Sequence, residues 1–126
     1  MSKLFLMDID DTISNGVVTK EHLIKCIDQG NFVMSASARS VENQTLFFKE
    51  LGVPIVGVCQ KEFSIAKKKA EELGISKSDI ILVDDGYSRP GFGDVLINHE
   101  RARDANIVYW LPEKFVEEFM ILKEVK

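Results

Sequence analysis

The chain alternates five short apolar runs with longer amphipathic segments, and this alternation constrains the fold more than any other feature. Each run is four to six residues long and mostly lacks polar alternation, as do strands that are buried on both faces. The runs lie at residues 4–7, 31–36, 54–59, 80–83 and 107–111. Strands that alternate with helices form parallel sheets with right-handed crossovers, so the pattern predicts an α/β fold.

The segments between the runs have helical spacing of apolar residues and recognisable ends. Thr19 is placed to cap a helix, Gly52 and Gly74 each end a helical pattern, and Pro112 opens the last one. We expect helices at residues 20–29, 41–51, 62–73, 94–105 and from 112 onward. A chain of 126 residues suits one domain, which we place over residues 1–126. The prediction is a three-layer α/β/α, Rossmann-like domain with a parallel sheet of about five strands.

Composition and charge exclude several classes of protein. No apolar run approaches the roughly 20 residues of a membrane helix, and the first residues lack the pattern of a secretory signal. Cys26 and Cys59 have no metal-binding or disulfide spacing, so we expect reduced thiols in the core of a cytoplasmic protein. The net charge of −4 counts against broad nucleic-acid binding.

Charged and polar residues follow four of the five predicted strands. In open α/β sheets the ligand crevice lies at the carboxyl ends of the strands, so these residues are expected to converge on one edge. They are Asp8 and Asp10 after the first strand, Ser37 and Arg39 after the second, Lys61 after the third, and Asp84 and Asp85 after the fourth.

Carboxylates gathered in one crevice need a cation, because two of them 4 Å apart repel by about 4 kcal/mol at an effective dielectric constant of 20. With no His or Cys beside them, their hard oxygen ligands favour Mg²⁺. Ser37, Arg39 and Lys61 are suited to the oxygens of a phosphate group. Asp8 could then act as a nucleophile and Asp10 as a general acid and base.

Four motifs in this order resemble those of the haloacid dehalogenase (HAD) superfamily, most of whose members are phosphatases. The segment "DIDDT" from Asp8 is similar to the DxDxT signature, and "FVMSASAR" resembles the second motif, with Ser37 a better match than Ser35. Lys61, at the start of a predicted helix, resembles the third motif, and the acidic pair of "IILVDD" resembles the fourth. The resemblance covers nearly the whole chain.

The resemblance implies particular roles. Asp8 is the nucleophile and a Mg²⁺ ligand, and Asp10 is the acid/base, which also binds Mg²⁺ through its backbone carbonyl. Ser37 holds the transferring phosphoryl group, and Lys61 bridges that group and Asp8. Asp85 is the metal ligand on the fourth strand.

The chain also departs from the usual motifs of the family. Asp84 stands where a glycine is common and is expected to support the metal site from outside it. The loop "GYSRPGFGD" is longer than the usual spacing, so Asp94 is not assigned to the metal. Arg89 lies on this loop, close to the expected crevice, and together with Arg39 is a candidate for substrate binding.

The intervals between the motifs are too short for a cap domain, so we expect a capless member with an open site. In the family this form accompanies large substrates or neighbouring subunits that complete the site, so a homo-oligomer is one possibility. The substrate candidates are a small phosphorylated metabolite and a nucleic-acid end or nucleotide, as in a polynucleotide 3′-phosphatase.

Other interpretations of the same residues remain open. The chain could be a catalytically inactive binding module with the HAD fold. Ser37 could be a helix N-cap and no phosphate ligand. Tyr109 and Trp110 are better explained by packing than by stacking on nucleic-acid bases.

Overall fold

The computed structural model describes residues 2–86 and 102–120 and shows a four-stranded sheet in which all neighbouring strands are parallel. Met7, at the end of the first strand, lies opposite Ser35 on one side and Val83 on the other. The strands are β1 (Leu4–Met7), β2 (Phe32–Ser35), β3 (Ile80–Val83) and β4 (Val108–Trp110), in the order β2-β1-β3-β4. The predicted α/β fold with a parallel sheet is confirmed for these residues.

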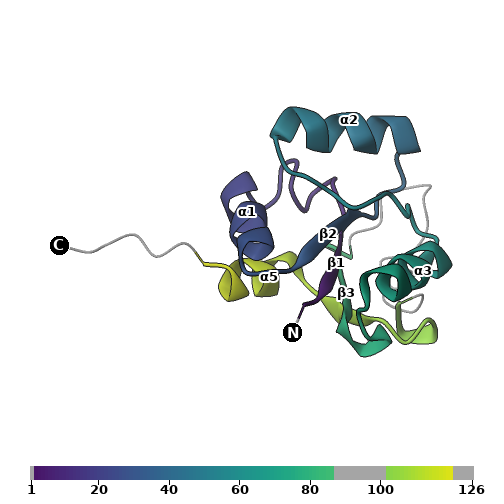
Figure 1. Ribbon diagram of the computed structural model, residues 1–126. Coiled ribbons are helices and arrows are strands. Elements are labelled where there is room, and N and C mark those ends of the chain that lie inside the picture. The colour runs from purple at the N-terminus through teal and green to yellow at the C-terminus, as the bar shows by residue number, and fades with distance from the viewer. Residues whose placement is uncertain (1, 87–101, 121–126) are drawn as a thin grey trace.

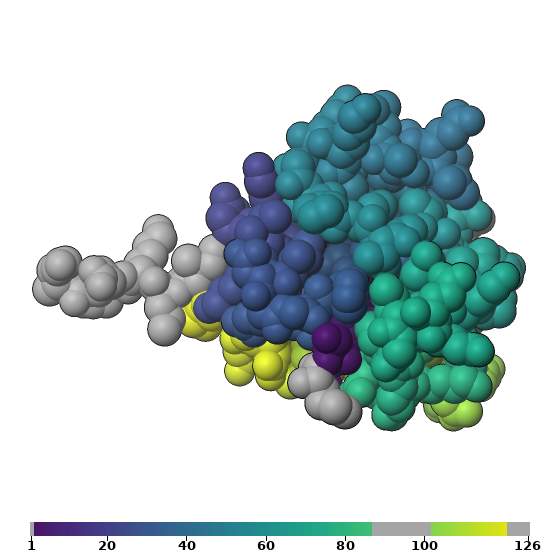
Figure 2. Space-filling model, viewed as in Figure 1, coloured from purple at the N-terminus to yellow at the C-terminus, as the bar shows by residue number. Residues whose placement is uncertain are grey.

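Helices flank the sheet on both faces (Figure 1). They are α1 (Lys20–Asp28), α2 (Val41–Leu51), α3 (Phe63–Leu73), α5 (Pro112–Glu118) and the short 3₁₀ helix η1 (Lys77–Asp79). α1 and α5 pack on one face and α3 on the other, while α2 covers the top of the molecule in the view of Figure 2. Within the described ranges, no helix combines the length and apolar character needed to cross a membrane.

Alternate residues of β1 enter two separate hydrophobic cores. Phe5 and Met7 pack with residues of α1 and α5, whereas Leu4 and Leu6 pack with residues of α3. All four side chains are fully buried. A strand covered on both faces needs no polar positions, which explains why this run is uninterrupted.

The helix ends predicted from the sequence agree with the structure. Thr19 caps α1, and its side-chain oxygen accepts a hydrogen bond from the backbone N–H of His22. Gly52 and Gly74 end α2 and α3 with left-handed φ angles of 82° and 73°. A side chain is disfavoured in this conformation, so glycine is the natural residue at both positions.

The third apolar run, residues 54–59, lies beside β2 but does not form the regular strand that we expected. The N–H of Val56 donates to the Val33 carbonyl at 2.9 Å, and the N–H of Cys59 donates to the Ser35 carbonyl at 2.9 Å. From Val33 to Ser35 is two residues along β2, whereas from Val56 to Cys59 is three residues along the neighbouring segment. The extra residue interrupts the regular hydrogen bonding between the two. A single bridge between Ser35 and Val58 remains, so the described residues form four strands with an irregular segment at one edge.

The predicted helix at 94–105 falls largely outside the described residues, although residues 102–104 are helical. Cys26 and Cys59 are free and buried, in agreement with the prediction of reduced core thiols. Burial raises the pKa of both thiols to about 12, so both are protonated at neutral pH.

Candidate active site

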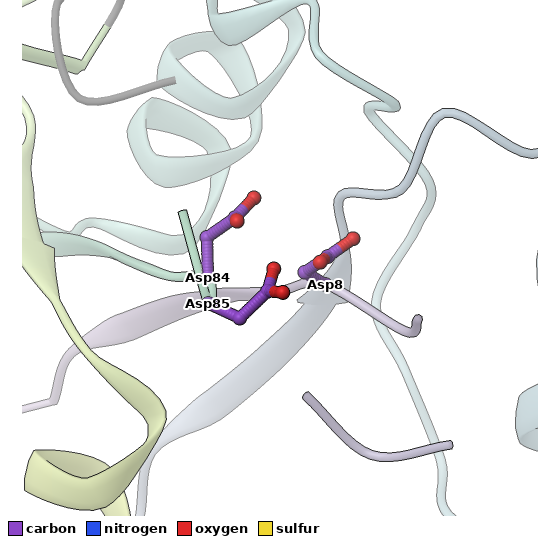
Figure 3. Close-up of side chains that lie close together, drawn as sticks. All are labelled: Asp8, Asp84 and Asp85. Atoms are coloured by element: carbon purple, nitrogen blue, oxygen red, sulfur yellow. The ribbon is translucent and has the colours of Figure 1, made fainter. Parts of the chain in front are cut away.

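The carboxyl ends of β1 and β3 bring three carboxylates together. Asp8 continues the pairing of Met7 with Val83, because its N–H donates to the Val83 carbonyl at 3.0 Å. Asp84 and Asp85 follow Val83 directly. Asp8, Asp84 and Asp85 each place a carboxylate oxygen within 4.8 Å of the others, and the Asp85 carboxylate is turned toward Asp8 (Figure 3). The chain leaves β1 toward β2 on one side and returns to β3 on the other, so this is the point where ligands bind in such sheets.

Asp8 is 7% exposed, and its surroundings disfavour the charged form. The pKa of Asp8 is raised to about 7, and burial is the largest cause. The charges of Asp84 and Asp85 also contribute to this rise, while Lys61 and the N–H of Ile9 oppose it. A cation between these carboxylates would remove the repulsion and return Asp8 to its ionised form.

Lys61 forms ion pairs with two of the three carboxylates. Its Nζ lies 2.6 Å from Oδ2 of Asp84 and 3.7 Å from Oδ1 of Asp8. Burial would lower the pKa of this lysine, but Asp8 and Asp84 together outweigh burial and raise it. The lysine therefore stays protonated at neutral pH and supplies a fixed positive charge beside Asp8.

Asp84 is 1% exposed and holds Lys61 in place. Its Oδ2 accepts from Lys61, and its Oδ1 accepts from the backbone N–H of Gly86 at 2.8 Å. The hydroxyl of Tyr109 donates to the Asp84 carbonyl at 2.7 Å, which fixes the backbone at the same residue. Both carboxylate oxygens of Asp84 are thus bonded within the protein, which suits Asp84 to a supporting role in the site.

The Asp10 carboxylate is not one of these three clustered carboxylates and pairs with Arg39. The guanidinium donates from Nη2 to Oδ1 of Asp10 at 2.7 Å and from Nε to Oδ2 at 3.1 Å. The same side chain donates to Oδ1 of Asn43 at 2.9 Å and lies over the ring of Phe47. Arg39 is thus a fixed partner of the predicted acid/base, and a contact between Arg39 and substrate stays a prediction.

Ser37 lies two residues past the end of β2, at the same edge of the sheet, and is 1% exposed. The alternative role as a helix N-cap is wrong, because α2 begins after Ser40, whose side chain accepts from Asn43 N–H. The Ser37 hydroxyl oxygen accepts from the Arg39 N–H at 3.3 Å. Its hydroxyl proton can therefore be donated to an oxygen of a ligand.

Three residues important to this site were not assigned a role from the sequence. Thr12 is fully buried and donates from its hydroxyl to Asp8 at 3.4 Å. Tyr109 holds Asp84, and Gln44 is a fully buried amide in contact with the Ser37 loop. Only Thr12 had a sequence signal, as the last residue of "DIDDT"; the other two come from elements that are close to the site only after folding.

A cavity of about 320 Å³ opens beside Asp85. Its lining includes Asp11, Asn15 and Glu113, so the surface next to the acidic cluster is itself polar and acidic. Arg89, which the sequence placed near this crevice, lies outside the described residues, as does Asp94, which was not assigned to the metal.

The donor atoms at this edge of the sheet fit a hard divalent cation. Asp8 and Asp85 contribute carboxylate oxygens, and the described residues of the cluster include no thiolate or imidazole. Oxygen-only donor sets favour cations such as Mg²⁺ over softer metals. The acidic cluster could therefore hold a metal ion. That the ion is Mg²⁺, and that Asp10 is one of its ligands, stay predictions.

No protein-family model matches the chain, and no curated protein does. The resemblance to the HAD superfamily therefore depends on the four motifs. Their residues Asp8, Lys61 and the pair Asp84 and Asp85 come from distant parts of the sequence and meet in the fold.

Proposed function

We propose that the protein is a Mg²⁺-dependent phosphomonoesterase of the HAD superfamily, without a cap domain, that acts through an aspartyl-phosphate on Asp8. One observation carries the proposal: a protonated lysine, Lys61, lies between Asp8 and Asp84, with Asp85 turned toward Asp8. A buried carboxylate beside a fixed positive charge and a metal-binding carboxylate is suited to attack an anionic phosphoryl group.

In the first step an oxygen of Asp8 attacks the phosphorus atom, and the bond from phosphorus to the leaving-group oxygen breaks. Asp10 gives its proton to that oxygen, and the alcohol departs. In the second step water attacks the phosphorus atom, its proton goes to Asp10, and the bond between phosphorus and the Asp8 oxygen breaks, so that inorganic phosphate is released. Asp8 and Asp10 are then restored to their starting forms.

The other residues bind and orient the phosphoryl group. Lys61 and the Ser37 hydroxyl donate to its oxygens, and Asp84 keeps Lys61 protonated and directed at Asp8. A divalent cation held by Asp8, Asp85 and the predicted carbonyl of Asp10 would offset the negative charge of the phosphoryl group. Arg39 pairs with both oxygens of the Asp10 carboxylate, so this pair has to open before Asp10 can carry the proton that the first step requires.

The site is proposed to be open. Between β1 and β2 the chain forms α1, and between β2 and Lys61 it forms α2 and the segment 54–59; these short intervals support a form without a cap. An open site suits a small phosphorylated metabolite with a neighbouring subunit as the lid, or a large substrate. The acidic lining next to Asp85 and the net charge of −4 both disfavour a nucleic-acid substrate.

The test of this function is the hydrolysis of p-nitrophenyl phosphate by the purified protein. We expect phosphate release that requires Mg²⁺, stops when EDTA is added and returns when Mg²⁺ is restored. A panel of phosphorylated metabolites and end-phosphorylated oligonucleotides then defines the substrate class. Full activity in EDTA, or no release from any substrate with Mg²⁺ present, would contradict the proposal.

The affinity for Mg²⁺ is expected to rise with pH up to about pH 7 and then to level off. Without metal the Asp8 carboxyl is protonated below its pKa of about 7, and Mg²⁺ must displace that proton. One displaced proton makes binding about tenfold weaker at pH 6 than at pH 8. Calorimetric titration at the two pH values measures this, and equal affinities would show that Asp8 is already ionised or is not a ligand.

A further inference from the structure

The side chain of Gln44, on α2, is fully buried and uses its amide to hold the loop that follows β2. Its oxygen accepts from the Ser35 hydroxyl at 2.5 Å and from the Ser37 N–H at 3.0 Å. Its nitrogen donates to the Ser37 carbonyl at 3.1 Å and to the Arg39 carbonyl at 2.6 Å. Both polar atoms of one amide are therefore bonded, three times to the loop and once to the strand.

These hydrogen bonds fix the backbone just beyond the end of the sheet. β2 ends at Ser35, so the backbone of Ser37 is beyond the ladder that fixes the strand. The amide of Gln44 binds both the N–H and the carbonyl of Ser37, which fixes the peptide groups on either side of its Cα. The direction of the Ser37 side chain is thus set by a residue that follows it by seven positions.

A second glutamine connects the same loop to the lysine segment. Gln60 donates from its side-chain nitrogen to the Arg39 carbonyl at 2.9 Å, so that this carbonyl accepts from two glutamines. Gln60 has a left-handed φ of 52°, which a residue with a side chain adopts at a cost, and it directly precedes Lys61. The Ser37 loop and the start of the Lys61 segment therefore share one hydrogen-bonded carbonyl.

We propose that Gln44 is a positioning residue, which holds the Ser37 loop in the geometry needed for phosphoryl transfer, and that Gln60 couples this loop to Lys61. The proposal rests on the proposed function, because Ser37 and Lys61 are the groups that would bind the phosphoryl oxygens. Neither glutamine touches the substrate. Their effect is on the placement of two donors that come from different segments of the chain.

The main test is the Gln44→Met variant, which keeps the length of the side chain and removes all four hydrogen bonds. We expect kcat for p-nitrophenyl phosphate to fall by about 10- to 100-fold, because small displacements of a binding group have effects of this size. KM is expected to change less, since the Ser37 hydroxyl matters most as the phosphoryl group is transferred. The exchange rate of the Ser37 amide proton should rise at least about tenfold, because its buried acceptor is gone.

Ser35→Ala provides the matched control. It removes one hydrogen bond to the same amide but leaves those to Ser37 and Arg39 in place. We expect it to lower the melting temperature and to keep kcat within about threefold of wild type, with slow exchange at Ser37. The proposal is overturned if Gln44→Met keeps the wild-type kcat, if Ser35→Ala loses as much activity, or if Ser37 exchange is the same in both.

Gln60→Gly is the second variant, and it tests the coupling to Lys61 whether or not Gln44→Met folds. Glycine adopts a positive φ easily, so the substitution removes the amide without adding backbone strain. We expect kcat to fall at least about threefold without loss of melting temperature, and an unchanged kcat would overturn the coupling to Lys61. If the wild-type protein hydrolyses no phosphomonoester, the proposed function fails, and Ser37 exchange still decides whether Gln44 holds the loop.

Discussion

Asp8→Asn is expected to reduce phosphate release at least about 10⁴-fold while the protein stays folded. The asparagine amide has nearly the shape of the carboxylate but cannot form the aspartyl-phosphate, so substrate can bind and the reaction cannot start. The metal-free variant should be no less stable than wild type, because it lacks a buried charge repelled by Asp84 and Asp85. Steady-state kinetics and thermal melting with and without Mg²⁺ measure both effects.

Asp104→Asn is the control for this substitution, because the Asp104 side chain is 79% exposed, on the helical residues 102–104. It makes the same chemical change away from the acidic cluster and should leave kcat and the melting temperature unchanged. If Asp8→Asn retained the turnover of wild type, the nucleophile would have to be another residue. A loss of fold in Asp8→Asn would instead show that Lys61 needs this carboxylate for stability.

Lys61→Met is expected to lower kcat by about 10³-fold and also to destabilise the protein. The methionine is similar in length but leaves Asp8 and Asp84 without their shared cation. Breaking a buried ion pair costs about 3 kcal/mol when one partner remains charged. Because Lys61 lowers the pKa of Asp8, its removal also raises that pKa further and leaves less of the ionised nucleophile at neutral pH.

This variant separates electrostatics from packing through its pH dependence. The loss of stability should be larger at pH 8 than at pH 5. At pH 5 Asp8 is protonated in both proteins, whereas at pH 8 the variant must either ionise Asp8 without its cation or keep a proton that the unfolded chain would release. Urea unfolding at the two pH values measures the difference, and Lys68→Met, on the exposed face of α3, is the control. A loss of stability that is equal at both pH values would indicate that packing alone is involved.

The strands and most helix ends could be predicted because the signals that fix them are local. The run at 4–7 is continuous because both faces of β1 are covered, and Gly52 and Gly74 end their helices through their own backbone conformations. The segment 54–59 has the same apolar composition, but its pairing with β2 includes one extra residue. The composition of a segment does not determine its pairing register with a neighbouring strand, so this irregularity could not be predicted.

The same distinction applies to the candidate site. Asp8, Lys61 and Asp85 were predicted from motifs, because each follows a predicted strand and strand ends meet at one edge. Gln44 looks like any polar residue of an exposed helix, and Tyr109 like a packing residue of a strand. Their roles depend on which backbone groups of Ser37 and Asp84 face them, which follows only from the tertiary structure.

The ion pair between Lys61 and Asp84 joins segments that lie on opposite sides of β1. The lysine comes after the edge segment beyond β2, whereas Asp84 directly follows β3 on the other side of the central strand. A partly folded chain in which either half of the sheet is missing therefore cannot form the ion pair between Lys61 and Asp84. The proposed hydrolytic activity should thus appear only after both halves of the sheet have formed, and a fragment lacking β3 should bind phosphate no better than an unfolded peptide.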